Sequence, residues 1–393
     1  MRWSTVIALG LCWVAAAAGG QIERIDGRGS AGEVISLDDD ALTVRADGAE
    51  RAVPRDELVR VALSEPGDVM ASHMSVLATA AGDVLRVGGL TLDEDTLAFR
   101  SELLGAVELP LGAGAVLYQP PEGMTAEAVH RKCEQMELTR GTRDVLVFAR
   151  PDGNWLTVGG ALRSIEAETI TFHWKQKDRT FDRAKVAAVY LASTKRELPP
   201  ATGTLVARDG SEIAFTGVAL DAERATITSP LLGRRKIARR RVAVIRFESD
   251  RVTYLAELEP VKTTEHGVFT TFEHRLDASV GGGPLRLGGR AYQRGLGVHS
   301  FCELTWALDG RFSRFVGVVG IDDAVRPHGE AVVTFLADGE PLAEPMTVTG
   351  TDEPRTVRLD LSGARRLTLR VEMGPHDLDV GDRVDIASAR LIE

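Results

Sequence analysis

The sequence predicts an all-β protein in which about four small β-barrel repeats, joined by one helix, precede a C-terminal β-sandwich. Three observations support this prediction. Short runs such as Thr169-Ile170-Thr171-Phe172 alternate polar and apolar residues, which is the period of a half-buried strand. One strand-turn-strand pattern recurs four times before residue 251. Longer alternating strands then follow, with turns about every eight to twelve residues, as in a sandwich or jelly roll.

Residues 1–20 have the three parts of a secretory signal peptide. Arg2 supplies the basic start, an apolar stretch runs from Val6 to Ala18, and small residues lie around Gly20. The apolar stretch is shorter than the roughly 20 residues that span a bilayer. Cys12 follows Leu11 inside this stretch, so we expect no lipid anchor. The predicted mature chain is exported after cleavage and is periplasmic, secreted or at the cell surface.

The composition is typical of a folded protein with several domains. The chain has 393 residues, of which 44% are hydrophobic, enough for two or more cores. After residue 20 only Cys133 and Cys302 remain, so no disulfide framework is expected. The net charge of −10 disfavours nucleic acid as a partner. No later segment is long and apolar enough for membrane insertion.

The repeat is defined by an apolar anchor, an acidic residue after it, and a second strand that begins five residues on. The anchors are Leu37, Leu92, Ile165 and Leu220. Leu37 and Leu92 are 55 residues apart, as are Ile165 and Leu220, and the second pair follows the first after 128 residues. Duplication of a two-unit ancestor explains this spacing. We therefore expect the four anchors to occupy equivalent core positions.

Each repeat of about 45 residues is too short for a large flat sheet, whereas a small barrel removes exposed edges. The strand pattern is similar to that of SH3 and Sm-like barrels, without a signature residue that assigns a family. The sequence leaves open whether the first repeat is complete. The expected domains are a signal peptide 1–20, β-repeats 21–66 and 67–121, a linker helix 122–143, β-repeats 144–198 and 199–251, and a sandwich 252–393.

One segment, from Thr125 to Leu138, has helical periodicity. Thr125 is a suitable N-cap, and Val129, Cys133 and Met136 follow at i, i+4 and i+7. We expect this helix to pack across two barrels.

Eight short elements follow one another between residue 254 and the C-terminus. They are Tyr254–Leu258, Leu287–Tyr292, Gly295–His299, Leu308–Gly310, Val319–Asp323, Asp338–Gly339, Asp360–Ala364 and Asp385–Leu391. In this order they resemble the NPCBM (novel putative carbohydrate-binding module) family, whose domains are often attached to glycoside hydrolases. The resemblance implies a galactose-binding-like β-sandwich that binds a glycan or polysaccharide.

One element departs from the family pattern. Where the family usually has Asp-Trp-Ala, this chain has Asp385-Ile386-Ala387. Sugar recognition commonly combines an aromatic face with hydrogen-bonding side chains. Tyr292 or Trp306 is a candidate replacement ring. The alternative, which the strand alternation favours, is that Ile386 and Trp306 are core residues.

The candidate glycan-binding residues are His299, Tyr292, Asp322, Asp323 and Asp385. His299 follows a Gly-x-Gly turn and is a candidate partner for a sugar hydroxyl. The alternative is a half-buried histidine that bonds a loop carbonyl. We expect three polar loops to come together around it, namely Gly297–Ser300, Asp322–His328 and His376–Asp385.

The same three carboxylates are candidate calcium ligands. Asp322, Asp323 and Asp385 offer the hard oxygen atoms that Ca²⁺ prefers, so a structural calcium ion is one expectation. The alternative is that Asp322 and Asp323 cap a strand and its turn through their own hydrogen bonds.

The densest charge run lies in the fourth repeat. It consists of Arg234, Arg235, Lys236, Arg239, Arg240 and Arg241. Arginine pairs well with multidentate anions such as sulfate and uronic-acid groups. A solvated strand face is the favoured interpretation, because Ile237 and Val242 lie at strand-like positions beside the run.

Motifs for catalysis are missing from the sequence. It has no Gly-x-Ser-x-Gly and no His-Glu-x-x-His, and no feature singles out the facing carboxylates that a glycosidase needs. We expect a non-enzymatic, exported carbohydrate-binding protein whose repeats are spacer or docking units. The alternative is an envelope scaffold that has lost sugar binding and has envelope proteins as partners.

Overall fold

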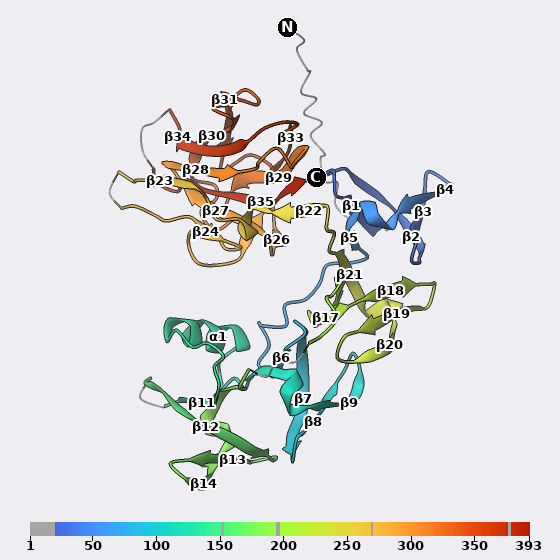
Figure 1. The fold of residues 1–393 in the computed structure, drawn as a ribbon, viewed down its shortest axis with the longest axis vertical. Coiled ribbons are helices and arrows are strands. Elements are labelled where there is room, and N and C mark those ends of the chain that lie inside the picture. The colour runs from blue at the N-terminus through green and yellow to red at the C-terminus, as the bar shows by residue number, and fades with distance from the viewer. Residues whose placement is uncertain (1–19, 151–152, 194–196, 269, 376–378) are drawn as a thin grey trace. The chain divides into compact units, whose positions relative to one another are not determined.

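The computed structural model describes residues 20–150, 153–193, 197–268, 270–375 and 379–393. The predicted signal peptide lies outside these ranges apart from Gly20. Strands make up 55% and helices 7% of the structure, which confirms the all-β class. The chain forms two compact units (Figure 1): the repeat region, residues 20–23 and 29–248, and the sandwich unit, residues 24–28 and 249–393.

The repeat region contains four successive units with the same connectivity. The first has β1 (Gly20–Arg24), β2 (Gly29–Leu37), β3 (Ala41–Ala46), β4 (Ala49–Pro54) and β5 (Leu58–Ala62), so it is complete. Neighbouring strands β1 to β4 pair in order, and β5 returns to pair with β1. A register shift between Val34 and Ser36 bends β2. The first half of β2 pairs with β1 and its second half pairs with β3, so the strand curves around a small core.

The other three units repeat this plan. The second has β6 (Ser75–Thr79), β7 (Val84–Asp93), β8 (Thr96–Ser101), β9 (Gly105–Pro110) and β10 (Gly114–Tyr118). The third has β11 (Asp144–Ala149), β12 (Trp155–Ile165), β13 (Thr169–Trp174), β14 (Lys177–Asp182) and β15 (Val186–Tyr190). The fourth has β16 (Gly203–Ala207), β17 (Glu212–Phe215), β18 (Gly217–Leu220), β19 (Arg224–Ser229), β20 (Gly233–Ala238) and β21 (Val242–Phe247). A 3-10 turn precedes the last strand of every unit: Arg55–Glu57, Leu111–Ala113, Arg183–Lys185 and Arg239–Arg241.

The four anchors occupy corresponding positions, as the repeat predicts. Leu37, Ile165 and Leu220 are the last residues of β2, β12 and β18, and Leu92 is the last but one of β7; each is only 1–2% exposed. Leu37 pairs with Leu220, and Leu92 pairs with Ile165. The units therefore associate as first with fourth and second with third.

The final strands complete these two associations. Strand β5 pairs with β21, and β10 pairs with β15. The two associations are themselves joined where Glu212 of β17 pairs with Val84 of β7. The four units are therefore not separate barrels, because their pairings join 21 strands into one hydrogen-bonded network. This pairing satisfies backbone groups that isolated barrels would leave at exposed edges.

Two arginines hold the two associations in the same way. Arg183 begins the third 3-10 turn and donates through Nη1 to the carbonyl oxygens of Leu90 and Glu166, both at 2.7 Å. Arg239 begins the fourth and donates through Nη1 to Ile35 O at 3.2 Å and Asp221 O at 2.8 Å. Each guanidinium thus joins its own unit to the partner unit.

The predicted helix is α1 (Ala126–Gln135). Thr125 is its N-cap, and its Oγ1 accepts a hydrogen bond from the backbone N–H of Ala128 at 3.2 Å. Val129 and Cys133 are buried in a cluster with residues of β6, β10, β11 and β15, so the helix packs across the second and third units. It ends before the predicted Leu138 because Glu137 adopts a left-handed φ of 54°.

The sandwich unit has two main sheets that enclose one core. One sheet has the order β24-β27-β35-β29-β33 with β22 beside β35, and the other has β23-β28-β34-β30-β31 with β32 beside β30. A small hairpin pairs β25 with β26. The bounds are β22 (Val252–Tyr254), β23 (Lys262–Glu265), β24 (Arg275–Leu276), β25 (Leu285–Leu287), β26 (Arg290–Tyr292), β27 (Gly295–His299), β28 (Cys302–Ala307), β29 (Arg314–Ile321), β30 (Glu330–Ala337), β31 (Glu340–Pro341), β32 (Met346–Thr349), β33 (Arg355–Asp360), β34 (Arg366–Met373) and β35 (Arg383–Ile392).

The core of the sandwich contains both Ile386 and Trp306. Each is fully buried in the cluster between the sheets. The departure from Asp-Trp-Ala therefore changes a core position rather than a surface ring, as the strand alternation favoured.

The sandwich unit also includes a segment from the beginning of the chain. The buried Arg390 donates to Ile25 O at 3.1 Å and to Arg24 O at 2.9 Å. Arg358 donates to Asp26 O at 3.2 Å. The unit therefore adds residues 24–28 to the predicted range 252–393.

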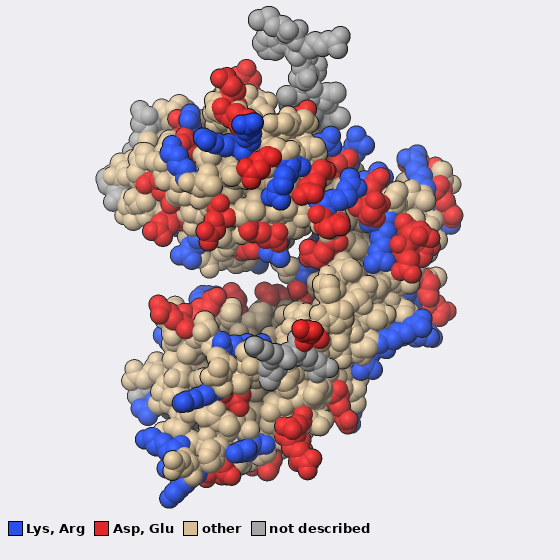
Figure 2. All heavy atoms as spheres, in the orientation of Figure 1, with Lys and Arg blue, Asp and Glu red and all other residues tan. Residues whose placement is uncertain are grey.

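Charge is dispersed over both units. On the face shown in Figure 2, acidic and basic side chains are interspersed. Among the described residues, no helix is long and apolar enough to cross a membrane.

Candidate functional site

Three polar loops meet at one end of the sandwich. Ser300, which follows β27, donates through Oγ to Asp382 Oδ2 at 2.7 Å. The backbone N–H of Glu330, at the start of β30, donates to Asp382 Oδ1 at 3.0 Å. The backbone N–H of Asp322 donates to Arg383 O at 2.9 Å. The structure thus brings together the loops predicted from the sequence, of which residues 376–378 lie outside the described residues.

His299 ends strand β27 and is 5% exposed. Its Nδ1 lies 2.7 Å from the carbonyl oxygen of Ser300. A carbonyl only accepts, so Nδ1 carries the proton, and in a neutral ring Nε2 is then an acceptor. The bond of Nδ1 agrees with the alternative interpretation of His299 as a histidine that bonds a loop carbonyl. Nε2 has no hydrogen-bond partner among the described residues.

An aromatic ring lies against this histidine. Phe272 is in the loop between β23 and β24, and its centroid is 4.5 Å from that of His299, with 33° between the ring planes. Phe272 is 37% exposed, and Val268 in the same loop and Val380 beside Asp379 in sequence are exposed as well. Exposed apolar side chains beside fixed polar groups are typical of a binding surface.

Two buried carboxylates support these loops. Asp379 accepts a hydrogen bond from the backbone N–H of Val268 at 2.8 Å, so it fixes the loop that carries Phe272. Burial raises the pKa of Asp382, against the lowering effect of its bonds from Glu330 and Ser300. We refer to Val268, Phe272, His299, Ser300, Asp379 and Asp382 as the loop cluster.

The predicted carboxylates Asp322, Asp323 and Asp385 form a different group. Asp322 accepts from Ser279 Oγ and, at 2.8 Å, from the backbone N–H of Ala324. Asp323 accepts from the backbone N–H groups of Gly288 at 2.9 Å and Gly289 at 2.7 Å. The bond from Ala324 is the local turn capping of the alternative interpretation, whereas the bonds from Ser279, Gly288 and Gly289 hold the distant segment 279–289 in place.

Asp385 is the most buried member of this group. Its Oδ2 accepts from the backbone N–H of Arg286 at 3.0 Å, and its Oδ1 has no hydrogen-bond partner among the described residues. Burial, with the negative charges of Asp322 and Asp323, raises the pKa of Asp385 to about 8. Asp322 and Asp385 are 2% and 0% exposed, and they bond the segment 279–289 rather than residues of the loop cluster.

No set of three or more His, Cys, Asp or Glu side chains in the described part of the chain is arranged to hold a metal ion. Calcium binding by Asp322, Asp323 and Asp385 stays a prediction.

The sandwich part of the chain matches one family model. Residues 251–392 match the NPCBM/NEW2 domain. The family match covers the C-terminal third of the chain, and the preceding repeats have no family assignment.

The NPCBM domain also has relatives among known proteins. A putative endo-alpha-N-acetylgalactosaminidase of Renibacterium salmoninarum is 30% identical over 122 residues, which are 30% of this chain and 8% of that protein. The chain therefore matches a small part of that relative.

Solved structures similar to this chain include two carbohydrate-binding modules from Clostridium perfringens. The CBM51 of a Clostridium perfringens GH95 in complex with methyl-galactose is 25% identical, covering 36% of this chain and 99% of that one, with a TM-score of 0.33. CBM51-2 in complex with GlcNAc and INT domains from Clostridium perfringens ZmpB is 20% identical, covering 46% of this chain and 38% of that one, with a TM-score of 0.34.

Within the NPCBM domain, the structure does not place Tyr292 beside His299. Tyr292 ends β26, and the guanidinium of Arg290 lies 4.5 Å above its ring. Strand β27 separates the two residues, and its span from Gly295 to His299 is about 13 Å at 3.3 Å per residue. Phe272 is the ring at His299 instead. The sequence did not indicate Phe272, because it lies in a loop outside the family-like elements.

Proposed function

We propose that this protein binds carbohydrate through the loop cluster of its NPCBM domain. The family match of residues 251–392 supports a carbohydrate-binding role. The observation that carries the proposal is the partly exposed ring of Phe272 against His299, at the point where three polar loops meet.

Each member of the loop cluster has a role in this proposal. Phe272 offers an apolar face to the C–H surface of a pyranose. His299, oriented by its Nδ1 bond to Ser300 O, accepts a hydrogen bond from a sugar hydroxyl through Nε2. One polar contact contributes about 0.5–1.5 kcal/mol and the stacked ring about as much. A single site is therefore weak and gains from multivalent display.

The proposal includes export and a non-catalytic mode of action. The signal-peptide pattern of residues 1–20 supports export to the periplasm, the cell surface or the medium. The repeat region then serves as a spacer or docking element. Its continuous network of 21 strands supports a stiff spacer, because neighbouring units share backbone hydrogen bonds.

The rival interpretation is an envelope scaffold that has lost sugar binding, because the tryptophan of the family pattern is missing. Ile386 stands in its place and is buried in the core, so the substitution removes no ring from the surface. We therefore favour carbohydrate binding.

A glycan array tests the proposal with the chain from residue 21 onward. We expect saturable binding to at least one glycan, and loss of most of it in Phe272→Ala and in His299→Ala. Tyr292→Ala is the matched control, because it removes a ring outside the loop cluster, and it should bind normally. Circular dichroism checks that each variant is folded.

Two results would contradict the proposal. One is undiminished binding by both folded loop-cluster variants. The other is silence across neutral, acidic and sulfated glycans together with capture of a single protein partner, which would favour the scaffold.

A further inference from the structure

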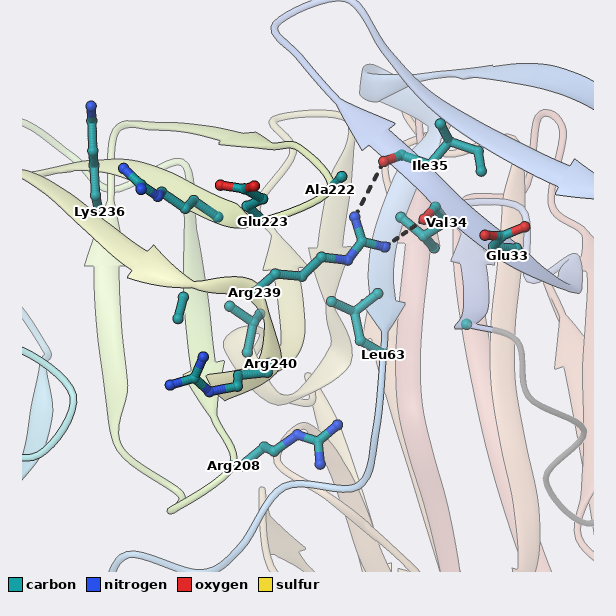
Figure 3. Close-up of a pocket in the computed structure, with 14 residues that line it drawn as sticks. Glu33, Val34, Ile35, Leu63, Arg208, Ala222, Glu223, Lys236, Arg239 and Arg240 are labelled. Carbon is teal, nitrogen blue, oxygen red and sulfur yellow. Dashed lines mark hydrogen bonds between the residues drawn. The ribbon is translucent and has the colours of Figure 1, made fainter.

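A cavity of about 980 Å³ lies in the repeat region between the first and fourth units (Figure 3). It lies where β2 of the first unit meets β18 of the fourth. Glu33, Val34 and Ile35 line it from the first unit, and Arg239 and Arg240 are among the residues that line it from the fourth. We call this cavity the basic groove.

The charge of the basic groove is predominantly positive. Its cations are Arg208, Arg224, Lys236, Arg239 and Arg240, and its carboxylates are Glu33 and Glu223. Arg45, outside the groove, bonds the carboxylate of Glu33 at 3.0 Å. Arg45 also bonds Glu50 at 2.6 Å, so it offsets only part of the negative charge of Glu33, and the five cations of the groove still outnumber its two carboxylates.

One of these cations has a structural role. Figure 3 shows the guanidinium of Arg239 turned toward the carbonyl groups of Val34 and Ile35, to which it donates hydrogen bonds. These neutral carbonyl groups satisfy its donors without cancelling its charge. Arg239 therefore adds a fixed positive charge to the wall of the groove.

Three others are exposed and have no counter-ion. Arg208, Lys236 and Arg240 are exposed, and none forms an ion pair with a described residue. Arginine and lysine side chains without ion-pair partners around a concave surface create a positive potential, which favours the binding of anions.

The third unit shows that the fold does not need these charges. Its 3-10 turn begins at Arg183 as that of the fourth begins at Arg239, and strands β13 and β14 have the register of β19 and β20. The matched positions are Arg224 with Thr169, Lys236 with Thr180, and Arg240 with Ala184. The structural arginine is thus present in both units, whereas Arg224, Lys236 and Arg240 have uncharged counterparts in the third unit.

We propose that the basic groove binds an acidic polysaccharide through its sulfate or carboxylate groups. A volume of about 980 Å³ is at the upper end of the roughly 300–1,000 Å³ of ligand pockets, enough for a few sugar rings. Arg208 and Arg240 bind separate anionic groups along the polymer. This site is distinct from the loop cluster of the NPCBM domain.

The overall charge favours a glycan over nucleic acid. The chain has a net charge of −10, which repels a dense polyanion such as DNA with its charge every 1.7 Å or so. A uronic-acid polymer carries at most one carboxylate on each sugar ring, so its charges lie farther apart than those of duplex DNA and a local basic groove can bind it.

Titration of the chain from residue 21 onward with dextran sulfate, polygalacturonate and uncharged dextran tests the proposal. We expect binding to at least one charged polymer, weaker at high salt, and no binding to dextran. The variant Lys236→Thr/Arg240→Ala introduces the side chains of the third unit and should stay folded. Loss of one exposed ion pair lowers the affinity roughly two- to fivefold. We therefore expect this double variant to bind the charged polymer about tenfold more weakly than the parent.

Two controls make the result decisive. Lys177→Thr/Arg234→Ala removes two exposed cations outside the groove and should bind as the parent does. Phe272→Ala should also bind charged polymer normally, which separates this site from the loop cluster. Equal weakening by the Lys177/Arg234 variant, no effect of the groove variant, or no binding to either charged polymer would overturn the proposal. Stronger binding to single-stranded DNA than to the polysaccharides would show that the partner class is wrong.

Discussion

The buried carboxyl of Asp385 should make the sandwich less stable as pH rises. Its pKa is raised to about 8, against about 3.9 in an unfolded chain. Between these values the folded state holds a proton that the unfolded state has released. The free energy of unfolding therefore falls by about 1.4 kcal/mol per pH unit, or about 3 kcal/mol from pH 5 to pH 7.

Asp385→Asn removes this titration while keeping the acceptor for Arg286 N–H, so its stability should depend less on pH. In the parent protein, the loss of about 3 kcal/mol between pH 5 and pH 7 corresponds to a fall of roughly 6–12 °C in the melting temperature of a domain this size. Asp382, whose pKa is also raised by burial, contributes in the same direction, so the variant should retain part of the slope.

Urea unfolding at pH 5, 6 and 7 in the presence of a chelator measures this effect. Trp306 is buried in the sandwich core. In the chain from residue 21 onward, which lacks Trp3 and Trp13, the changes Trp155→Phe/Trp174→Phe leave Trp306 as the remaining tryptophan, so its fluorescence reports on that unit. The acidic groups with lowered pKa values, such as Asp360, titrate below this window. A free energy of unfolding that is flat or rises with pH, or an equal slope in Asp385→Asn, would refute the reasoning.

Three further predictions concern single sites. If Asp322, Asp323 and Asp385 bind calcium, Ca²⁺ should raise the melting temperature of the sandwich; equal values in excess Ca²⁺ and excess chelator would leave them as turn formers. Arg239→Ala should destabilise the repeat region by about 2 kcal/mol, because it removes charged donors from backbone carbonyls, and Arg183→Ala by a similar amount; urea unfolding that shows no loss in either would contradict the role given to them. Thr125→Ala should cost about 1 kcal/mol through loss of the N-cap, and an unchanged free energy of unfolding would show that the cap is not needed.

Periodic features were predictable from the sequence. The anchors Leu37 and Leu220 could be found because strand alternation and a fixed spacing are local patterns. Thr125 could be assigned as an N-cap for the same reason. Ile386 could be placed in the core by its alternation along the strand, which is why its departure from the family pattern does not alter the surface.

Features that depend on distant contacts were not predictable. Nothing in the spacing of the units indicates that the first pairs with the fourth, because either unit could have paired with its neighbour along the chain. Phe272 and Asp382 lie in loops, where no period marks which side chains meet. The contacts of Arg390 with residues 24 and 25 join segments at opposite ends of the sequence.

The nested pairing of the units has a consequence for synthesis of the chain. The second and third units are neighbours in sequence, so they can assemble soon after both have left the ribosome. The first unit must wait for the fourth, because Leu37 and its partner Leu220 are 183 residues apart. During that interval β5 lacks its partner β21, and unpaired strand edges favour association with other chains. A nascent chain that stops before the fourth unit should therefore need a chaperone more than the complete chain does.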